Sequence, residues 1–157
     1  MSDSESKDSW LKFSMSREYF FTKVMLIDDG EIDLLVNRRL IELTSFASSV
    51  IITSSAEEAL EFFKNECRNS EEVPDWIFLD MNLPGISGYE FVESFSSLPN
   101  FIKNKCRIVI LSAFQKKELL EKVLTSPFVH SQLEKPLTQQ SLKALASSVR
   151  TTTDASS

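Results

Sequence analysis

The sequence predicts an α/β domain in which a parallel sheet is covered by helices on both faces. Between residues 23 and 150, five short apolar runs alternate with five segments whose apolar residues recur at helical spacing. The runs are apolar on both faces, as expected of strands buried between two layers of helices. The chain has 157 residues, of which 42% are hydrophobic, and this suits one domain with its own core.

The first half of the domain supplies three predicted strands, residues 23–29, 49–54 and 75–80. A helix after the second strand is indicated by a capping box, in which Ser55 and Glu58 stand three residues apart ahead of an apolar stripe. After the first strand, helical spacing predicts a helix with one apolar face, formed by Ile32, Leu35, Val36, Leu40 and Leu43.

The second half continues the alternation to residue 150. Ser87 and Glu90 form another capping box at the start of a helix. The remaining segments are a strand at 106–113, a helix at 115–125, a weak polar strand at 127–136 and a closing helix at 138–150. Polar, Ser-rich ends flank this domain, so residues 1–22 are expected to be a partly disordered leader and residues 151–157 a disordered tail.

Composition excludes several classes of function. The net charge is −6 and there is no Lys/Arg cluster, so we expect no nucleic-acid partner. No apolar run approaches the length of a membrane helix, and we expect no membrane insertion. Cys67 and Cys106 match no metal or redox spacing and there is no signal peptide, which together indicate reduced thiols in a cytoplasmic protein.

Polar side chains stand where four of the predicted strands end. Asp28 and Asp29 follow the first strand, Asp80 ends the third, Ser112 the fourth and Lys135 the fifth. Ligands of a parallel sheet bind beyond the carboxyl ends of its strands, so we expect these side chains to form one site.

The residue types at this edge suit phosphoryl chemistry. Three clustered carboxylates repel one another, and a bound divalent cation would reduce that repulsion. Hard oxygen ligands suit Mg²⁺. Asp80 could then act as a nucleophile that forms an aspartyl phosphate. Lys135 would neutralise phosphate oxygens, Ser112 could donate a hydrogen bond to the phosphoryl group, and Asn82 could offer its main-chain carbonyl to the metal.

Four motifs in this order make the sequence resemble the receiver domain of two-component response regulators: "MLIDD", "FLDMNLPGISGYEF", "VILSA" and "EKPL". The resemblance spans roughly residues 24–149. Each motif alone is weak, but all four in the correct β-α register are specific. The resemblance implies a doubly wound five-stranded sheet of order 2-1-3-4-5, the flavodoxin-like arrangement.

The resemblance also implies a role for each site residue. Asp80 matches the phosphoacceptor, Asp29 the direct Mg²⁺ ligand, Asp28 a ligand through water, Asn82 the main-chain ligand, Ser112 the switch hydroxyl and Lys135 the phosphate-binding lysine. Pro136 matches a proline that commonly follows a cis peptide bond.

One position departs from the family pattern. Members often carry an aromatic residue three positions before the lysine, and here that position is Gln132. Burying an amide without hydrogen-bond partners is costly, so we expect Gln132 to prefer the surface whether or not Asp80 is phosphorylated.

The resemblance implies a stand-alone response regulator, which accepts its phosphoryl group from a histidine kinase or histidine phosphotransfer protein. Only 21 residues follow Pro136, so we expect no output domain and a signal that passes to an unknown downstream protein. We expect no enzyme activity apart from the chain's own phosphorylation and dephosphorylation.

Two other interpretations use the same residues. A phosphatase of the haloacid-dehalogenase type also forms an aspartyl phosphate, but it needs an acid two residues after the nucleophile, where this chain has Asn82. A degenerate receiver that serves only for interaction is opposed by the presence of all the phosphorylation residues. Each acid alone could simply end a strand or cap a helix, and only their conjunction favours a pocket.

Overall fold

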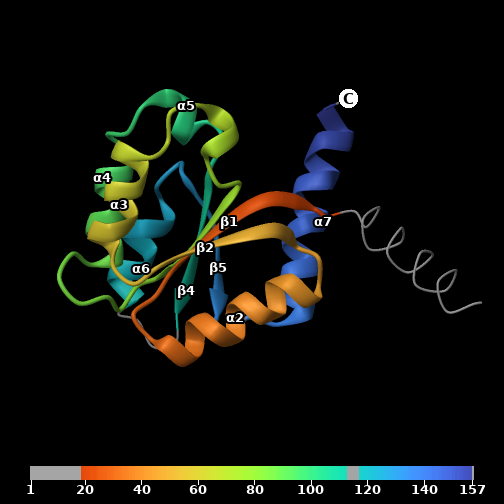
Figure 1. The fold of residues 1–157 in the computed structure, drawn as a ribbon, viewed down its shortest axis with the longest axis horizontal. Coiled ribbons are helices and arrows are strands. Elements are labelled where there is room, and N and C mark those ends of the chain that lie inside the picture. Colours follow the sequence, from red (N-terminus) through yellow and green to blue (C-terminus); the bar gives the residue numbers. More distant parts are fainter. Residues whose placement is uncertain (1–18, 113–116, 157) are drawn as a thin grey trace, which may run out of the picture.

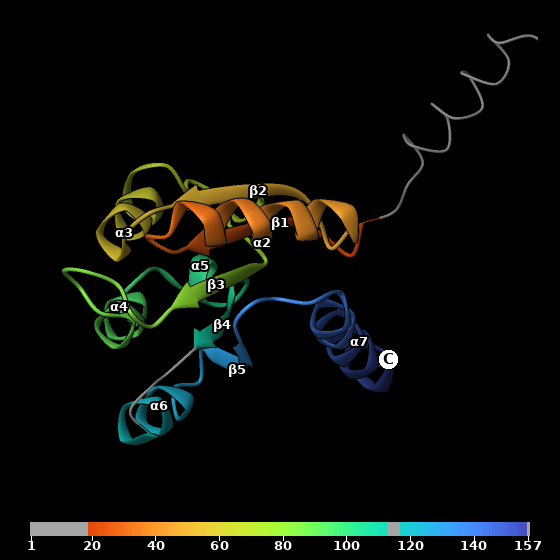
Figure 2. The same ribbon diagram turned by 90° about the horizontal axis from the view of Figure 1, so that it is seen from below.

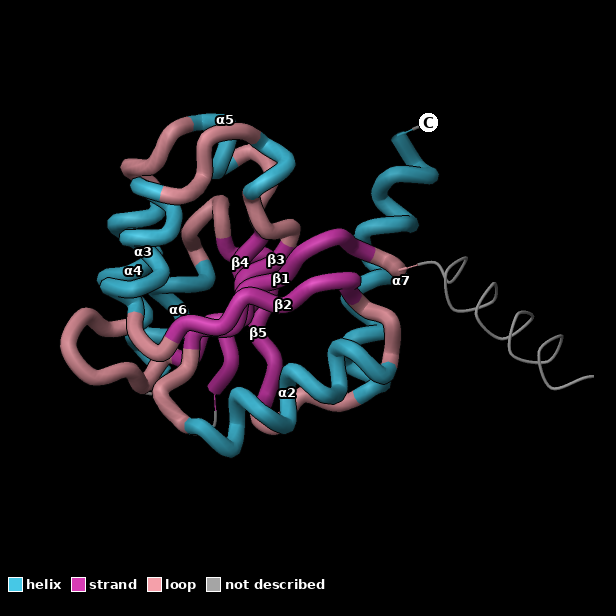
Figure 3. Tube along the Cα trace, in the orientation of Figure 1, coloured by secondary structure: helices cyan, strands magenta, loops and turns pink. Residues whose placement is uncertain are grey.

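A five-stranded parallel sheet forms the centre of the computed structural model, which describes residues 19–112 and 117–156. The strands are β1 (Phe21–Ile27), β2 (Ala47–Thr53), β3 (Trp76–Asp80), β4 (Arg107–Ser112) and β5 (Val129–Glu134). Their order is β2-β1-β3-β4-β5, which confirms the predicted fold class and can be followed from top to bottom in Figure 2. Figure 3 shows the strands gathered at the centre with helices around them. Most of the expected leader, residues 1–18, lies outside the described residues.

Helices cover both faces of this sheet. They are α2 (Glu31–Leu43), α3 (Ala56–Asn65), α4 (Gly88–Phe95), α5 (Asn100–Lys103), α6 (Lys117–Leu124) and α7 (Gln139–Ser156), with a short 3₁₀ turn at Ser70–Glu72. α2 and α7 lie on one face, and α3, α4 and α6 lie on the other (Figures 1 and 2). In the described part of the chain, no helix is both long and apolar enough to cross a bilayer.

The sheet divides the apolar interior into two cores. Successive residues of a strand point to opposite faces, so Val24 and Leu26 of β1 enter the core under α2 and α7. Met25 and Ile27 enter the core under α3, α4 and α6. All four side chains are at most 1% exposed, which explains why the strands are apolar on both faces.

Both predicted helix starts are confirmed, with Ser55 and Ser87 as the N-cap residues. The Ser55 side chain accepts a hydrogen bond from the backbone N–H of Glu58 at the start of α3. The Ser87 side chain accepts one from Glu90 at the start of α4. Each cap satisfies a backbone donor that the helix leaves without an internal partner.

The predicted apolar face of α2 is wrong. Ile32, Leu35, Val36 and Leu43 are 77%, 68%, 49% and 59% exposed, and Leu40 is half-buried. The buried residues of α2 are Leu34, Asn37 and Ile41, which also stand at helical spacing. At 3.6 residues per turn the two sets lie on opposite sides of the helix, and the sheet covers the smaller one. We refer to Ile32, Leu35, Val36 and Leu43 as the outer stripe of α2.

The ends of the domain also differ from the sequence-based bounds. β1 begins at Phe21, two residues before the predicted start, and the Phe21 ring packs edge-on against Trp76 with centroids 5.5 Å apart. The backbone of residues 151–156 continues α7, where a disordered tail was expected. No glycine or proline follows Gln139 to stop that helix.

The weakly predicted fifth strand is present as β5. It is one of the two edge strands, next to β4, and its residues are half-buried or exposed. An edge strand needs less apolar surface than a central one, which accounts for its polar composition.

Candidate functional site

The carboxyl edge of the sheet brings the predicted acids together. Asp28 and Asp29 directly follow β1, and Asp80 is the last residue of β3, the neighbouring strand. One carboxylate oxygen from each of these three residues lies within 4.8 Å of the others. Asp28 and Asp80 are only 2% and 4% exposed, whereas Asp29 is exposed to solvent.

Lys135 bridges the two buried carboxylates. Its Nζ lies 3.1 Å from Asp28 Oδ2 and 3.1 Å from Asp80 Oδ2, and its side chain is 17% exposed. The backbone N–H of Lys135 donates to the Ser112 carbonyl at the end of β4. The main chain therefore places the lysine beside β4, and its side chain reaches over to β1 and β3.

Each buried carboxylate is also held by a backbone donor two residues later. Gly30 N–H donates to Asp28 Oδ1 at 2.9 Å, and Asn82 N–H donates to Asp80 Oδ1 at 3.0 Å. Every oxygen of these two side chains thus has a partner, as burial of a charged group requires. The predicted use of the Asn82 carbonyl as a metal ligand stays a prediction.

Burial and the lysine act in opposite directions on Asp28. Burial raises the pKa of Asp28, against the effects of the Gly30 N–H and of Lys135, which lower it. Burial also lowers the pKa of Lys135, but its hydrogen bonds to Asp28 and Asp80 outweigh that effect and raise the pKa overall. The lysine is therefore charged at neutral pH.

The donor set fits a hard divalent cation. Three carboxylates and one ammonium give the cluster a formal charge of −2, and one of the acids faces solvent, from which a cation would enter. Carboxylate oxygens are the ligands that Mg²⁺ prefers, and Mg²⁺ also keeps several waters. The chemistry of these residues therefore matches the predicted cofactor.

Two contacts at this edge were missed from the sequence. Asp33 Oδ2 of α2 lies 3.5 Å from Lys135 Nζ, and its position one helical turn after Asp29 was the available signal. The backbone N–H of Ile86 donates to Glu57 Oε1 at 3.1 Å, which fastens the loop after Asp80 to the start of α3. In the same loop, Gly85 has φ of +74°, a conformation that favours glycine.

The expectation for Gln132 is wrong in part. Its side chain is half-buried, and its Nε2 donates to the Ser112 hydroxyl at 2.8 Å. The amide therefore finds a hydrogen-bond partner on the neighbouring strand, which removes the burial cost on which the expectation depended. Pro136, in contrast, follows a cis peptide bond as the resemblance implies.

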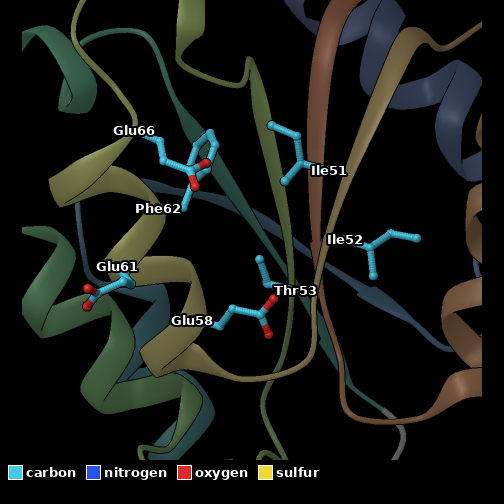
Figure 4. A pocket seen from close by; sticks show the side chains of 7 residues that line it. All are labelled: Ile51, Ile52, Thr53, Glu58, Glu61, Phe62 and Glu66. Atoms are coloured by element: carbon cyan, nitrogen blue, oxygen red, sulfur yellow. The ribbon is translucent and has the colours of Figure 1, made fainter.

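A separate hollow of about 260 Å³ lies at the outer edge of the sheet, between β2 and α3 (Figure 4). Its lining includes Ile51, Phe62 and three glutamates but none of the predicted site residues. One of those glutamates, Glu58, is bound by the backbone N–H and hydroxyl of Ser54. The candidate site is therefore the cluster at the carboxyl edge.

Comparison with known proteins gives one consistent family. The family model of the response regulator receiver domain matches residues 24–147. The two-component response regulator ORR1 of Oryza sativa subsp. japonica is 32% identical over 79 residues, which are 49% of this chain and 34% of the rice protein. The match therefore covers about a third of that relative's length.

Solved structures agree over a larger part of the chain. A two-component response regulator from Cytophaga hutchinsonii has a TM-score of 0.71 and 27% identity, and the match covers 85% of this chain and 99% of that one. A response regulator receiver protein from Dyadobacter fermentans has a TM-score of 0.69 and 26% identity, with 79% and 94% covered.

We expect Lys135→Met to lower the free energy of unfolding at pH 7, without divalent cations, by about 2–4 kcal/mol, because two buried carboxylates lose their counter-charge. The folded-state pKa of Asp28 lies above its unfolded value, and loss of the lysine raises it further. Protonation of Asp28 therefore favours the folded chain, and the loss shrinks as the pH falls to about 4.

Urea unfolding at the two pH values measures this difference. Lys143→Met, at an exposed position of α7, is the matched control and should change the free energy of unfolding by at most about 0.5 kcal/mol. An equal loss at both pH values would show that Lys135 stabilises the fold by packing and not by charge.

Proposed function

The chain belongs to the response regulator receiver domain family, and we propose that it accepts a phosphoryl group on Asp80 in a Mg²⁺-dependent reaction and signals through contacts with other proteins. The observation that carries this proposal is the convergence of buried Asp80 with Asp28, Asp29 and Lys135 at one edge of the sheet. The four groups come from three strands, and together they supply a nucleophile, cation ligands and a fixed positive charge.

Asp80 is the proposed nucleophile. One of its oxygens forms a bond to phosphorus while the phosphorus–nitrogen bond of a phosphohistidine breaks, and the donor imidazole leaves with the electron pair and takes up a proton. The Asn82 N–H and Lys135 hold the two Asp80 oxygens before the reaction. Lys135 also contacts Asp28, so it stays beside the site when the Asp80 carboxylate becomes an acyl phosphate.

Mg²⁺ would be held by Asp28, Asp29, Asp80 and the main-chain carbonyl of Asn82. When bound, it neutralises charge on the transferring phosphoryl oxygens. The Ser112 hydroxyl, at the end of the adjacent strand, is the proposed hydrogen-bond donor to the phosphoryl group on Asp80.

The outer stripe of α2 is the proposed contact surface for the phosphodonor, a histidine kinase or histidine phosphotransfer protein. α2 begins two residues after Asp29, so its first turn, with exposed Ile32, follows directly on the acidic cluster, and exposed Leu35 lies about one turn further along the helix. A donor that brings its phosphohistidine to the buried Asp80 must cover this rim of the sheet. An apolar donor surface would there remove exposed apolar side chains from water.

The setting that we propose is a cytoplasmic signalling pathway, in which the chain catalyses only its own phosphorylation and dephosphorylation. The buried thiols Cys67 and Cys106 are both free, which suits the reducing cytoplasm.

We expect Asp80→Asn to fold normally but to gain no phosphate, because an amide is not a competent nucleophile while its volume is nearly unchanged. Intact mass after incubation with Mg²⁺ and a small acyl phosphate measures the result, and the wild type should gain one alkali-labile adduct. Asp33→Asn, which changes a neighbouring exposed acid, should still gain it. Phosphate uptake by Asp80→Asn at the wild-type rate would exclude Asp80 as the acceptor.

We expect Asp29→Ala to weaken Mg²⁺ binding by more than about tenfold, and Asp80→Ala to do the same, because each removes a proposed direct ligand. Asp28→Ala should have a smaller effect, since Asp28 is proposed to act through water. Isothermal titration calorimetry gives the three affinities, with Glu31→Gln as a control at a nearby exposed acid. An Asp29→Ala protein with wild-type affinity would contradict the ligand assignment.

We expect Leu35→Glu to slow phosphotransfer from a phosphorylated histidine phosphotransfer domain that is active on the wild type, by more than about tenfold, because a charge enters the proposed apolar contact. The rate with a small acyl phosphate should not change, since that donor needs no docking surface. Leu124→Glu is the matched control and should transfer at the wild-type rate, because Leu124 is an exposed leucine at the end of α6, outside the outer stripe.

The two donors separate the possible causes. Equal slowing with both would show that the substitution disturbs the pocket itself. Unchanged transfer from the protein donor would show that the donor does not use the outer stripe.

A further inference from the structure

We propose that Gln132 is a positioning residue that holds the Ser112 hydroxyl away from Asp80 and so sets how readily Ser112 turns to a phosphoryl group. This inference rests on the proposed function of Asp80 and Ser112. It starts from the hydrogen bond of 2.8 Å that Gln132 Nε2 donates to Ser112 Oγ. Ser112 is 5% exposed, so its hydroxyl depends on protein partners and not on bulk water.

Strand register explains how the two side chains meet. Gln132 pairs with Ile110, and Ser112 pairs with Glu134, so Gln132 is a diagonal neighbour of Ser112 on the same face of the sheet. Diagonal neighbours on adjacent strands lie within reach of a long side chain. Glutamine is long enough to span this distance and carries a donor at its tip.

Strand order makes the contact a restraint. β4 lies between β3 and β5, so Asp80 and Gln132 stand on opposite sides of Ser112. Within the described residues, the Ser112 hydroxyl is bound to Gln132 and not to Asp80 or Lys135. Turning toward a phosphoryl group on β3 therefore means turning away from β5, and the bond to Gln132 is lost.

The side-chain amide of Gln132 borders an open, partly polar cavity. Gln132 lines an open cavity of about 450 Å³ at the outer edge of β5, together with Thr138 and Ser141. Because Gln132 is only half-buried and lines that open cavity, water can take the place of Ser112. The cost of release is then that of one ordinary hydrogen bond, which makes the restraint reversible.

An interaction made only in the phosphate-free state opposes phosphorylation by its own free energy. We therefore expect Gln132→Leu, which keeps much of the volume and loses the donor, to bind beryllofluoride about 2- to 10-fold more tightly in the presence of Mg²⁺. Gln132→Glu should show no such gain, because its carboxylate can accept a hydrogen bond from the Ser112 hydroxyl and hold it in place. Gln140→Leu, at an exposed position of α7, should match the wild type.

A double-substitution cycle ties the effect to Ser112. In a Ser112→Ala background the gain from Gln132→Leu should vanish, because no hydroxyl is left to hold. A gain that persists in that background would overturn the inference, because Gln132 would then act on general stability and not through Ser112. Weaker binding by Gln132→Leu would also overturn it, since Gln132 would then support the phosphorylated arrangement.

The wild type separates this inference from the proposed function. If it binds no beryllofluoride with Mg²⁺, the proposed function fails and the inference fails with it. If the wild type binds the mimic and Gln132→Leu binds it equally well, the proposed function stands and the restraint is refuted.

Discussion

The contact of Lys135 with Asp28 and Asp80 is the interaction on which the site depends. Two carboxylates that are almost fully buried end neighbouring strands, and both remain in the fold because one ammonium lies 3.1 Å from an oxygen of each. Their remaining oxygens are bound by backbone N–H groups. The strand ends thus form a charged cluster that is complete in hydrogen bonds but still carries excess negative charge, which is the condition for attracting a cation.

Much of the fold and of this cluster could be predicted from the sequence, because the signals were local. The capping boxes at Ser55 and Ser87 require residues only three positions apart. The convergence of Asp28, Asp80 and Lys135 needed one further argument, that parallel strands end at a common edge. Strand order came from resemblance to a family, since no local pattern states which strands are neighbours.

The features that could not be predicted depend on tertiary contacts. α2 has two sets of apolar residues at helical spacing, and the larger set predicted the wrong buried face. The direction in which the chain leaves β1 decides which set meets the sheet, and the helical spacing of the apolar residues does not encode that direction. Gln132 was judged by the cost of burying an amide alone, whereas its partner Ser112 lies 20 positions away in the sequence.

The buried and the exposed apolar residues of α2 have separate consequences for the protein. Leu34 and Ile41 hold the helix on the sheet, whereas Ile32 and Leu35 contribute little to the fold because they stand in water. Substitutions on the exposed side change the free energy of unfolding by about 0.5 kcal/mol or less in most proteins. The exposed side of α2 can therefore change in sequence while the core and the charged cluster at the carboxyl edge of the sheet stay the same, so one helix carries a variable surface on a constant framework.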